Sequence, residues 1–466
     1  MRFESDSTVI ESNSVQSQPR PKNIPNGFLL KNTVVAALGG LLFGFDTAVI
    51  AGTTSDLKRT FHLSPWLLGL TVAIALWGTV LGAMTAGVPG DRYGRRDSLR
   101  ILAFLYILSA VGCGVAWSWF SLAAFRFIEG VAIGGSSVLG PMYIAEIAPA
   151  KWRGRLVGFF QFNVVFGIML AYFSNYIISL LHFGEAEWRW KLGISALPAV
   201  LFFWMLFHIP RSPRWLVAKG QIEEARGVIV MGGCENPAED LLAIEESLHR
   251  ERSSDESLFS RRYLFPVFLA VTIGMFNQLS GINAILYYLN DIFADAGFSS
   301  LSSNIQSVCI GTTLLVFTSV GMLVIDHFGR KKLLLVGSIG TSVCLAGVAV
   351  VFFTHQHTRL LLWYLIGYIA FFALSQGAVI WVYISEVFPN HVRAKGQSLG
   401  SFSHWFMNAI ISAVFPIMAE SSGGYPFLFF SGMMILQFVV VLCFYPETKG
   451  LRLEDLEHKL AVRRMG

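Results

Sequence analysis

The chain has 466 residues, of which 54% are hydrophobic and only 14% are charged, and its formal net charge at pH 7 is +5. Soluble domains carry about 25% charged residues, so this composition excludes a soluble globular class and indicates an integral membrane protein. The positive charge does not indicate nucleic-acid binding, because the basic residues gather in short loops at the ends of apolar stretches. That distribution is typical of membrane topology.

The first segment of the chain, residues 1–29, is predicted to be a tail. It is polar from Met1 to Asn26 and rich in Ser, Gln and Pro. It lacks the basic start, short apolar core and small-residue cleavage site of a signal peptide. We therefore interpret it as a flexible cytoplasmic tail.

About twelve apolar stretches follow, each long enough to cross a bilayer as a helix. They lie near residues 30–52, 66–89, 99–117, 119–146, 156–181, 190–209, 263–290, 303–325, 333–353, 361–386, 397–418 and 424–445. The sequence has no alternating apolar and polar pattern of a membrane barrel, so the spans are expected to be helices.

The character of the sequence changes between the sixth and seventh stretches, where charges at helical spacing predict short surface helices. Basic loop residues favour the side on which both ends of the helix series lie, so both termini are expected in the cytoplasm. The predicted parts after the tail are a six-helix bundle (30–210), a cytoplasmic linker (211–262), a second six-helix bundle (263–445) and a cytoplasmic tail (446–466).

The two halves contain related segments. "GDRYGRR" (90–96) corresponds to "IDHFGRK" (325–331), and "YIAEIAPAKWRGR" (143–155) corresponds to "YISEVFPNHVRAK" (383–395). A six-helix unit used twice predicts two bundles with a binding site between them at the middle of the membrane.

The repeated charges are candidates for a cytoplasmic gate. They are Asp91, Arg95, Arg96, Glu146 and Arg153 in the first half, and Asp326, Arg330, Glu386 and Arg393 in the second. Ion pairs made across the bundles only when the cytoplasmic side is shut would favour the outward-open state. The alternative is that these charges only anchor the loops at the lipid headgroups.

Seven motifs in order resemble the sugar porter family of the major facilitator superfamily, from about residue 30 to residue 455. They are "GVPGDRYGRR" (87–96), "PMYIAEIAPAKWRG" (141–154), "SPRWL" (212–216), "NQLSGINAILYY" (277–288), "DHFGRK" (326–331), "WVYISEVFP" (381–389) and "PETKG" (446–450). The resemblance implies an all-α membrane protein with the major facilitator fold, twelve transmembrane helices in two six-helix bundles, and transport of a sugar.

A site for a neutral, polyhydroxylated ring needs side-chain amides, which both donate and accept, and aromatic faces. The amides at mid-membrane are Gln161, Asn277, Gln278, Asn283 and Asn408. Ser280 and Gly281 interrupt the seventh stretch, where a helix can unwind and offer backbone groups to a ligand. The alternative role of each amide is to hold helices together.

The resemblance assigns roles to particular residues. It implies sugar contacts by Gln161, Gln278, Asn283, Trp381 and Asn408, a pocket lining from Phe43 and Trp405, and a place near the outer gate for Tyr287. The chain departs from the family at Asn277, where Gln is usual, at Leu314 in place of Asn, at Ala378 in place of Pro, and at Arg211 in place of an acid. Ile168 is apolar where some pentose transporters carry a second Gln, which favours a hexose.

Asp46 interrupts the apolar run "LLFGFDTAVIAG" (41–52). An ionised carboxylate in the membrane costs about 2.5 to 3.5 kcal/mol, so Asp46 is expected to pair or to take up a proton. The resemblance implies Arg126 as its partner and a proton cycle, because an Asp occupies this position in proton-coupled sugar porters. Glu129, three residues after Arg126 where the family commonly has Gly, is expected to hold the arginine itself or to act as a second proton carrier.

The sequence therefore predicts uptake of a monosaccharide, a hexose rather than a pentose, by proton symport through alternating access at the plasma (inner) membrane. The alternatives are a facilitator without proton coupling, a non-transporting sugar receptor and, more remotely, a drug antiporter. Motifs of zinc proteases, hydrolases and P-loop ATPases are missing, and the five cysteines form no C-x-x-C pair. We expect no enzyme activity, no cofactor, no metal and no obligatory protein partner.

Overall fold

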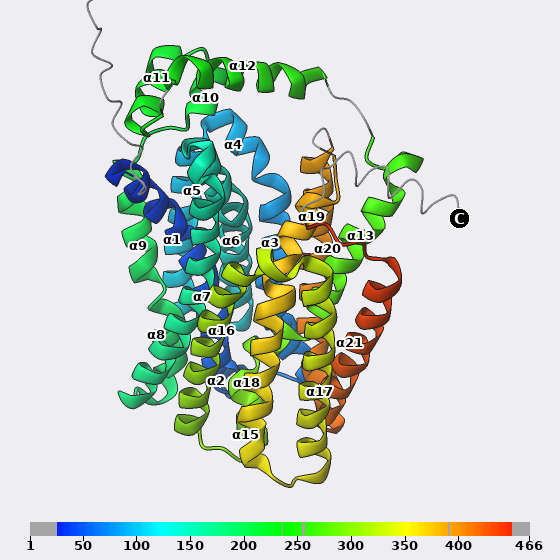
Figure 1. Cartoon of the computed structure of the whole chain (residues 1–466). Helices are drawn as coiled ribbons and strands as arrows, with labels where there is room; N and C mark the ends of the chain where they lie inside the picture. The colour runs from blue at the N-terminus through cyan, green and yellow to red at the C-terminus, as the bar shows by residue number, and fades with distance from the viewer. Residues whose placement is uncertain (1–25, 235, 254–256, 390–391, 450–466) are drawn as a thin grey trace, which may run out of the picture.

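The computed structural model describes residues 26–234, 236–253, 257–389 and 392–449. Throughout these residues the chain forms helices and connecting turns and no strand (Figure 1). Twelve helical segments in them are long and apolar enough to cross a membrane. The predicted all-α membrane protein with twelve spans is thereby confirmed. Most of the two predicted tails, 1–29 and 446–466, lies outside the described residues.

The first six spans end close to the predicted limits. They are α1 with η1 (Gly27–Val49, Ile50–Gly52), α3 (Pro65–Thr85), α5 (Arg95–Gly114), α6 (Trp119–Ile147), α7 (Ala150–Leu180) and the run α8, α9 and η3 (Glu187–Gly193, Ala196–Met205, Leu206–His208). The short elements α2 (Thr54–Phe61), α4 (Gly87–Tyr93) and η2 (Gly184–Ala186) join them. Ser64 caps α3 by accepting a hydrogen bond from the amide of Leu67, and Pro65 occupies the first helical position. α7 begins six residues before the predicted limit of 156, because its basic first turns extend the helix beyond the apolar stretch.

Three helices follow the sixth span: α10 (Pro213–Ala218), α11 (Ile222–Met231) and α12 (Pro237–Ser253). They lie across one end of the molecule, at the top of Figure 1. We call this the linker end, and the opposite end, where α2 and α15 (Leu289–Asp295) lie, the far end.

The last six spans complete the second bundle. They are α13 with α14 (Leu264–Leu279, Ile282–Tyr287), α16 (Ser300–Phe328), α17 (Arg330–Thr354), the run α18, η6 and α19 (Leu361–Phe372, Ala373–Gly377, Ala378–Glu386), α20 (Arg393–Ser421) and α21 (Gly424–Phe444). The short turns η4 (Arg261–Tyr263) and η5 (Thr358–Leu360) precede α13 and α18. η6 is a turn of π-helix inside the tenth span.

The predicted interruption of the seventh span is confirmed. α13 ends at Leu279, and α14 starts after Gly281, whose φ of 84° lies in the left-handed region. A Cβ at this glycine would lie 2.3 Å from the ring of Phe430. The carbonyl of Ser280, however, accepts a hydrogen bond from the hydroxyl of Tyr368 at 3.0 Å. One acceptor position of this carbonyl is therefore occupied by the protein, and the expectation that the break offers backbone groups to a ligand stays a prediction.

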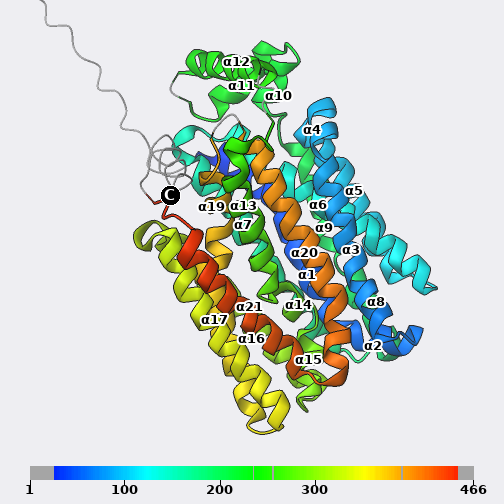
Figure 2. The same cartoon turned by 90° about the vertical axis from the view of Figure 1, so that its right-hand side faces the viewer.

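The two bundles meet through α3 against α20 and α7 against α16 (Figure 2). Gly69 brings α3 so close to α20 that an added Cβ would lie 2.0 Å from the carbonyl oxygen of Ala413. Toward the far end, the hydroxyl of Tyr172 on α7 donates to the carbonyl of Leu286 on α14 at 2.8 Å. One cluster of buried apolar side chains includes residues of both bundles, so the far end is closed.

Candidate functional site

Three charged residues meet inside the first bundle. α1 places Asp46 opposite α6, which carries Arg126 and, one turn later, Glu129; their exposed fractions are 4%, 2% and 2%. The same guanidinium nitrogen, Nη1 of Arg126, donates to Oδ1 of Asp46 and to Oε2 of Glu129, the latter at 3.0 Å. The expected contact of Arg126 with Asp46 and its expected contact with Glu129 are therefore both present, because the arginine binds the two acids at once.

This cluster has an imbalance of charge. Two carboxylates share one guanidinium, and Cys113, whose Sγ lies 4.0 Å from Oε2 of Glu129, adds no positive charge. A buried net negative charge is costly, and two adjacent carboxylates resist ionising together. The cluster thus contains one more acid than base, and its two carboxylates share a single cation.

The amides of the seventh span form a connected set. Gln278 donates to Oδ1 of Asn277 at 3.1 Å and accepts from the amide of Asn283 at 3.0 Å. On α20, Asn408 donates to the hydroxyl of Tyr287 at 3.2 Å. Amide groups from α13, α14 and α20 thus converge where the helix of the seventh span is broken.

Aromatic rings adjoin these amides. Phe43 of α1 lies 5.4 Å from Trp405 of α20, between ring centroids, which brings a residue of the first bundle against one of the second. Trp381 of α19 is 37% exposed, so one part of its ring is free of packing. An exposed indole beside converging amides is suited to the apolar face of a sugar ring.

His404 belongs to this group, and sequence reasoning missed it. Its ring lies 5.1 Å from that of Trp381 and 5.0 Å from that of Trp405, between centroids. The side-chain nitrogen of Gln278 lies 3.2 and 3.3 Å from the two ring nitrogens. The signal was present in "SHWFMN" (403–408), where a histidine precedes Trp405 in an apolar helix.

The remaining candidates of this site lie outside the bonded set. Gln161 is half-buried on α7 and takes part in none of the hydrogen bonds that join the set within the described residues. Ile168 on α7 and Leu314 on α16 are buried and apolar. Most of the polar groups of the candidate site are therefore the amide side chains of the second bundle.

At the linker end, Arg95 is the centre of the charges of the first half. It contacts Oε1 of Glu146 through Nη2 at 2.9 Å and Oδ1 of Asp91 through Nη1 at 2.8 Å. Ser212 donates to the other oxygen of Glu146. Both Arg95 and Arg96 are gate candidates from the sequence, beside Glu146. The structure selects Arg95, because Arg96 turns to its neighbour Asp97 and to the carbonyl of Ile209.

The second half repeats this arrangement. Arg330 contacts both oxygens of Glu386, at 2.9 and 3.2 Å, and Thr448 donates to Oε2 of Glu386 at 2.6 Å, as Ser212 does to Glu146. Arg393 donates to the carbonyl of Phe388. The ion pair of Arg95 with Glu146 joins α5 to α6 within the first bundle, and that of Arg330 with Glu386 joins α17 to α19 within the second. The side chain of Asp326 lies outside the described residues, and Arg153 is exposed on α7.

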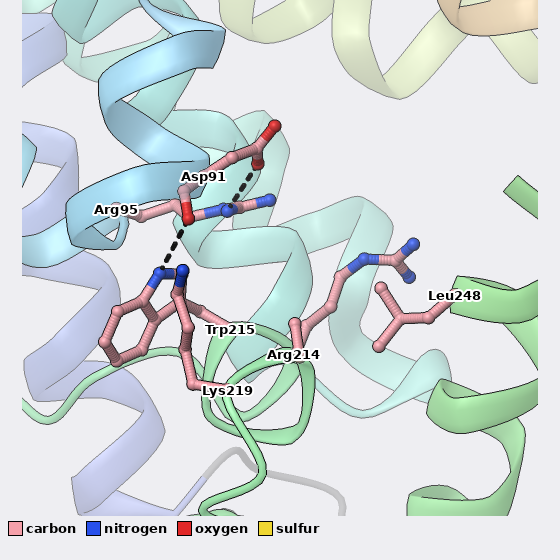
Figure 3. A pocket seen from close by; sticks show the side chains of 7 residues that line it. Asp91, Arg95, Arg214, Trp215, Lys219 and Leu248 are labelled. Carbon is pink, nitrogen blue, oxygen red and sulfur yellow. Dashed lines mark hydrogen bonds and ion pairs between the residues drawn. The ribbon is translucent and has the colours of Figure 1, made fainter. Parts of the chain in front are cut away.

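Asp91 and Arg95 border a cavity of about 350 Å³ between the first bundle and the linker helices (Figure 3). The indole nitrogen of Trp215 on α10 donates to the backbone carbonyl of Asp91 at 3.1 Å. Arg211 and Lys219 lie over the same indole ring, at 5.1 and 5.7 Å from its centroid. The linker is thus hydrogen-bonded to α4, the short helix that carries Asp91.

Comparisons with known proteins match nearly the whole chain. The family model described as sugar (and other) transporter matches residues 32–460. The D-xylose-proton symporter of Escherichia coli is 35% identical, over 93% of this chain and 96% of its own, and the arabinose-proton symporter of Bacillus subtilis is 35% identical, over 92% and 95%. The glucose transport protein of a Synechocystis strain is 36% identical, over 94% and 99%.

Solved structures are similar to the same extent. A partially occluded inward-open conformation of the xylose transporter XylE from E. coli matches with a TM-score of 0.83 and 33% identity, over 92% of this chain and 100% of that one. The proton:xylose symporter XylE of the major facilitator superfamily bound to 6-bromo-6-deoxy-D-glucose matches with a TM-score of 0.77 and 33% identity, over 94% and 100%.

Proposed function

The chain belongs to the sugar (and other) transporter family, and from that premise we propose that it carries a monosaccharide together with a proton across the plasma (inner) membrane by alternating access. The observation that carries the proposal is the buried group of Asp46, Arg126 and Glu129, which holds two acids for one base. Phe43, one turn before Asp46 on α1, contacts Trp405 among the amides and rings of the sugar site. Relatives described as xylose- and arabinose-proton symporters support the coupling.

We further propose that the linker end faces the cytoplasm, together with both termini. Basic loop residues of the linker end, such as Arg95, Arg153 and Arg330, support this orientation. The far end then faces outward and is closed. The higher TM-score to an inward-open conformation of XylE supports assigning the described state to an inward-facing one.

Protonation is proposed to act through Arg126. A proton on either acid weakens one of the two attractions that hold the guanidinium between α1 and α6. The relative stability of outward and inward states changes by the difference between their affinities for the proton, which is the requirement for coupling. At the linker end, Arg95 and Arg330 are then free to exchange partners within a bundle for partners across the bundles when that side shuts.

The sugar class is proposed as a monosaccharide. The preference for a hexose, taken from Ile168, has no support from the comparisons, because the relatives include a D-xylose, an arabinose and a glucose transporter. Pentoses are therefore candidates equal to hexoses. The amides of Gln278, Asn283 and Asn408 suit the hydroxyl groups that both classes share.

The test is uptake of radiolabelled sugars by proteoliposomes, for a panel of hexoses and pentoses, with and without an imposed pH gradient. We expect accumulation above the external concentration only when the outside is more acidic. The matched control is Glu185→Gln, a change of an exposed acid outside the site. Equilibration that ignores the gradient would identify a facilitator, and binding without any uptake would identify a receptor; either result overturns proton symport.

A further inference from the structure

Another acid, half-buried, lies at the far end, between the bundles. Asp291 on α15, in the second bundle, accepts a hydrogen bond through Oδ1 from the hydroxyl of Ser55 on α2, in the first bundle, at 2.8 Å. Its other oxygen, Oδ2, is buried and has no hydrogen-bond partner among the described residues. A carboxylate oxygen left in this condition favours the protonated form, since a neutral carboxyl is easier to bury.

The other two hydrogen bonds across the far end involve no carboxylate. Asn304 of α16 donates to the hydroxyl of Ser179 on α7 at 3.0 Å, and Tyr172 donates to the carbonyl of Leu286. These contacts and the bond from Ser55 to Asp291 form the outer seam. Of the three, only the bond to Asp291 joins the bundles through an acid whose charge changes in the ordinary pH range.

The charged groups near Asp291 do not neutralise it. Lys58 on α2 attracts the charged form, Asp295 on α15 repels it, and the neutral hydroxyls of Ser55 and Thr54 stabilise it by hydrogen bonding. Burial outweighs these attractions and raises the pKa of Asp291 to about 6. When the seam opens, the carboxyl meets water and its pKa returns toward the ordinary value of about 3.9.

We propose that Asp291 is a second proton-binding site of the transporter, and that its protonation from the outside closes the outer seam. The inference rests on the proposed function only in taking the far end as the outer side. A site with a higher proton affinity in the closed state stabilises that state at low pH and loses the effect as the pH rises through 6. Acid outside would therefore promote closure behind the sugar as well as supply the transported proton.

The test measures how far apart the two bundles lie at the outer seam, in the absence of sugar and of a pH gradient. Spin labels at Thr60→Cys on α2 and Ser300→Cys on α16, both exposed positions, report the distance between the bundles at the far end. The background replaces four cysteines by serine and keeps the buried Cys113; the four are Cys234, Cys309, Cys344 and Cys443. Distance distributions are recorded on purified protein in nanodiscs from pH 5.0 to 8.0.

We expect the ratio of closed to open far ends to rise about tenfold between pH 7.5 and 5.0, as pKa values of about 6 and about 3.9 require. Asp291→Asn should remain closed and lose the transition, and Ser55→Ala should move the midpoint to higher pH, because it removes a donor to the carboxylate. The control Asp295→Asn, one turn further on α15 and exposed, should keep the transition.

The same series in the Asp46→Asn background separates this site from the first. A transition that persists there but disappears in Asp291→Asn supports the proposal. A transition that survives Asp291→Asn with an unchanged midpoint, or a parent protein whose distances ignore pH, overturns it. Since no transport is measured, failure of sugar uptake in the liposome assay leaves this result unaffected, and the two proposals fail separately.

Discussion

Phe43 and Trp405 lie 5.4 Å apart, between ring centroids, and they belong to different bundles. Phe43 stands one turn before Asp46 on α1, and Trp405 follows His404 on α20. In the proposed mechanism, a shift of α1 caused by a change at Asp46 would reach the aromatic lining of the proposed sugar site through this contact. The proposed proton site and the proposed sugar site thus share one element, α1.

The first prediction concerns the proton. Asp46→Asn leaves Arg126 with Glu129 as its single acid, so the cluster no longer contains an acid in excess of its one base. We expect concentrative uptake to fall to simple equilibration, while exchange of sugar across the membrane at equal concentrations continues. The measurement is radiolabelled accumulation against counterflow in the same liposomes. Intact accumulation in this variant would contradict the role of Asp46.

The second prediction separates the two acids. Glu129→Gln keeps the contact of Arg126 with Asp46 and removes the second acid of the cluster. We expect concentrative uptake under an imposed pH gradient to persist, measured by the same accumulation assay. Loss of accumulation in Glu129→Gln together with intact accumulation in Asp46→Asn would show that Glu129, and not Asp46, is the acid required for coupling.

The third prediction concerns His404, which touches Trp381, Trp405 and Gln278. His404→Ala removes a polar partner of Gln278, and a lost hydrogen bond costs about 0.5 to 1.5 kcal/mol. We expect the KM for the sugar to rise by roughly 3- to 10-fold, and His404→Gln, which retains a donor and an acceptor, to be milder. Equal KM values for Ala and wild type would remove His404 from the site.

The fourth prediction compares the two charge pairs. In Arg95→Ala, the carboxylate of Glu146, whose side chain is 8% exposed, loses its cation, which for a buried pair costs about 3 to 5 kcal/mol. The side chain of Glu386 is 28% exposed, so Arg330→Ala is expected to cost less. Thermal unfolding of the purified protein measures both, with the exposed Arg153→Ala as control. A larger loss for Arg330→Ala than for Arg95→Ala would be the opposite of this expectation.

The fifth prediction concerns the break in the seventh span. Gly281→Ala forces a side chain into a left-handed backbone position and against Phe430, which together cost at least about 1 to 3 kcal/mol. We expect lower thermal stability and weaker sugar binding, since Gln278 and Asn283 flank the break. Gly297 also has a positive φ, but an added Cβ there would meet no neighbouring atom, so Gly297→Ala measures the backbone contribution alone. Equal losses in both variants would exclude a contribution from Phe430.

Much of the fold could be predicted because each membrane span is a long apolar stretch that is visible in the sequence. The start of α7 could not be predicted in this way, because the helix begins before the apolar stretch and includes basic residues such as Lys151. The break at Gly281 was predictable from the residue type. The bond from Tyr368 to Ser280 was not, because it joins residues far apart in the chain.

The site was predictable as a set of residue types and not as a set of contacts. Amides in apolar helices draw notice because they are rare there, whereas a histidine beside a tryptophan resembles ordinary packing, and His404 was missed for that reason. Arg95 rather than Arg96 pairs with Glu146 because its side chain is the one of the two that points at α6. The sequence does not show which of two adjacent helical residues faces a given neighbour. The proposed roles of these residues await the measurements above.

The π-helical turn η6 lies directly before α19 in the tenth span. Such a turn adds one residue to an α-helix, and each residue turns a helix by about 100°. The side chains of α19 are therefore rotated relative to those of an uninterrupted tenth span, and in the phase observed the ring of Trp381 lies beside that of His404. At the proposed sugar site, insertion or deletion of one residue in this turn would change which side chains of α19 line the site, without any substitution among them.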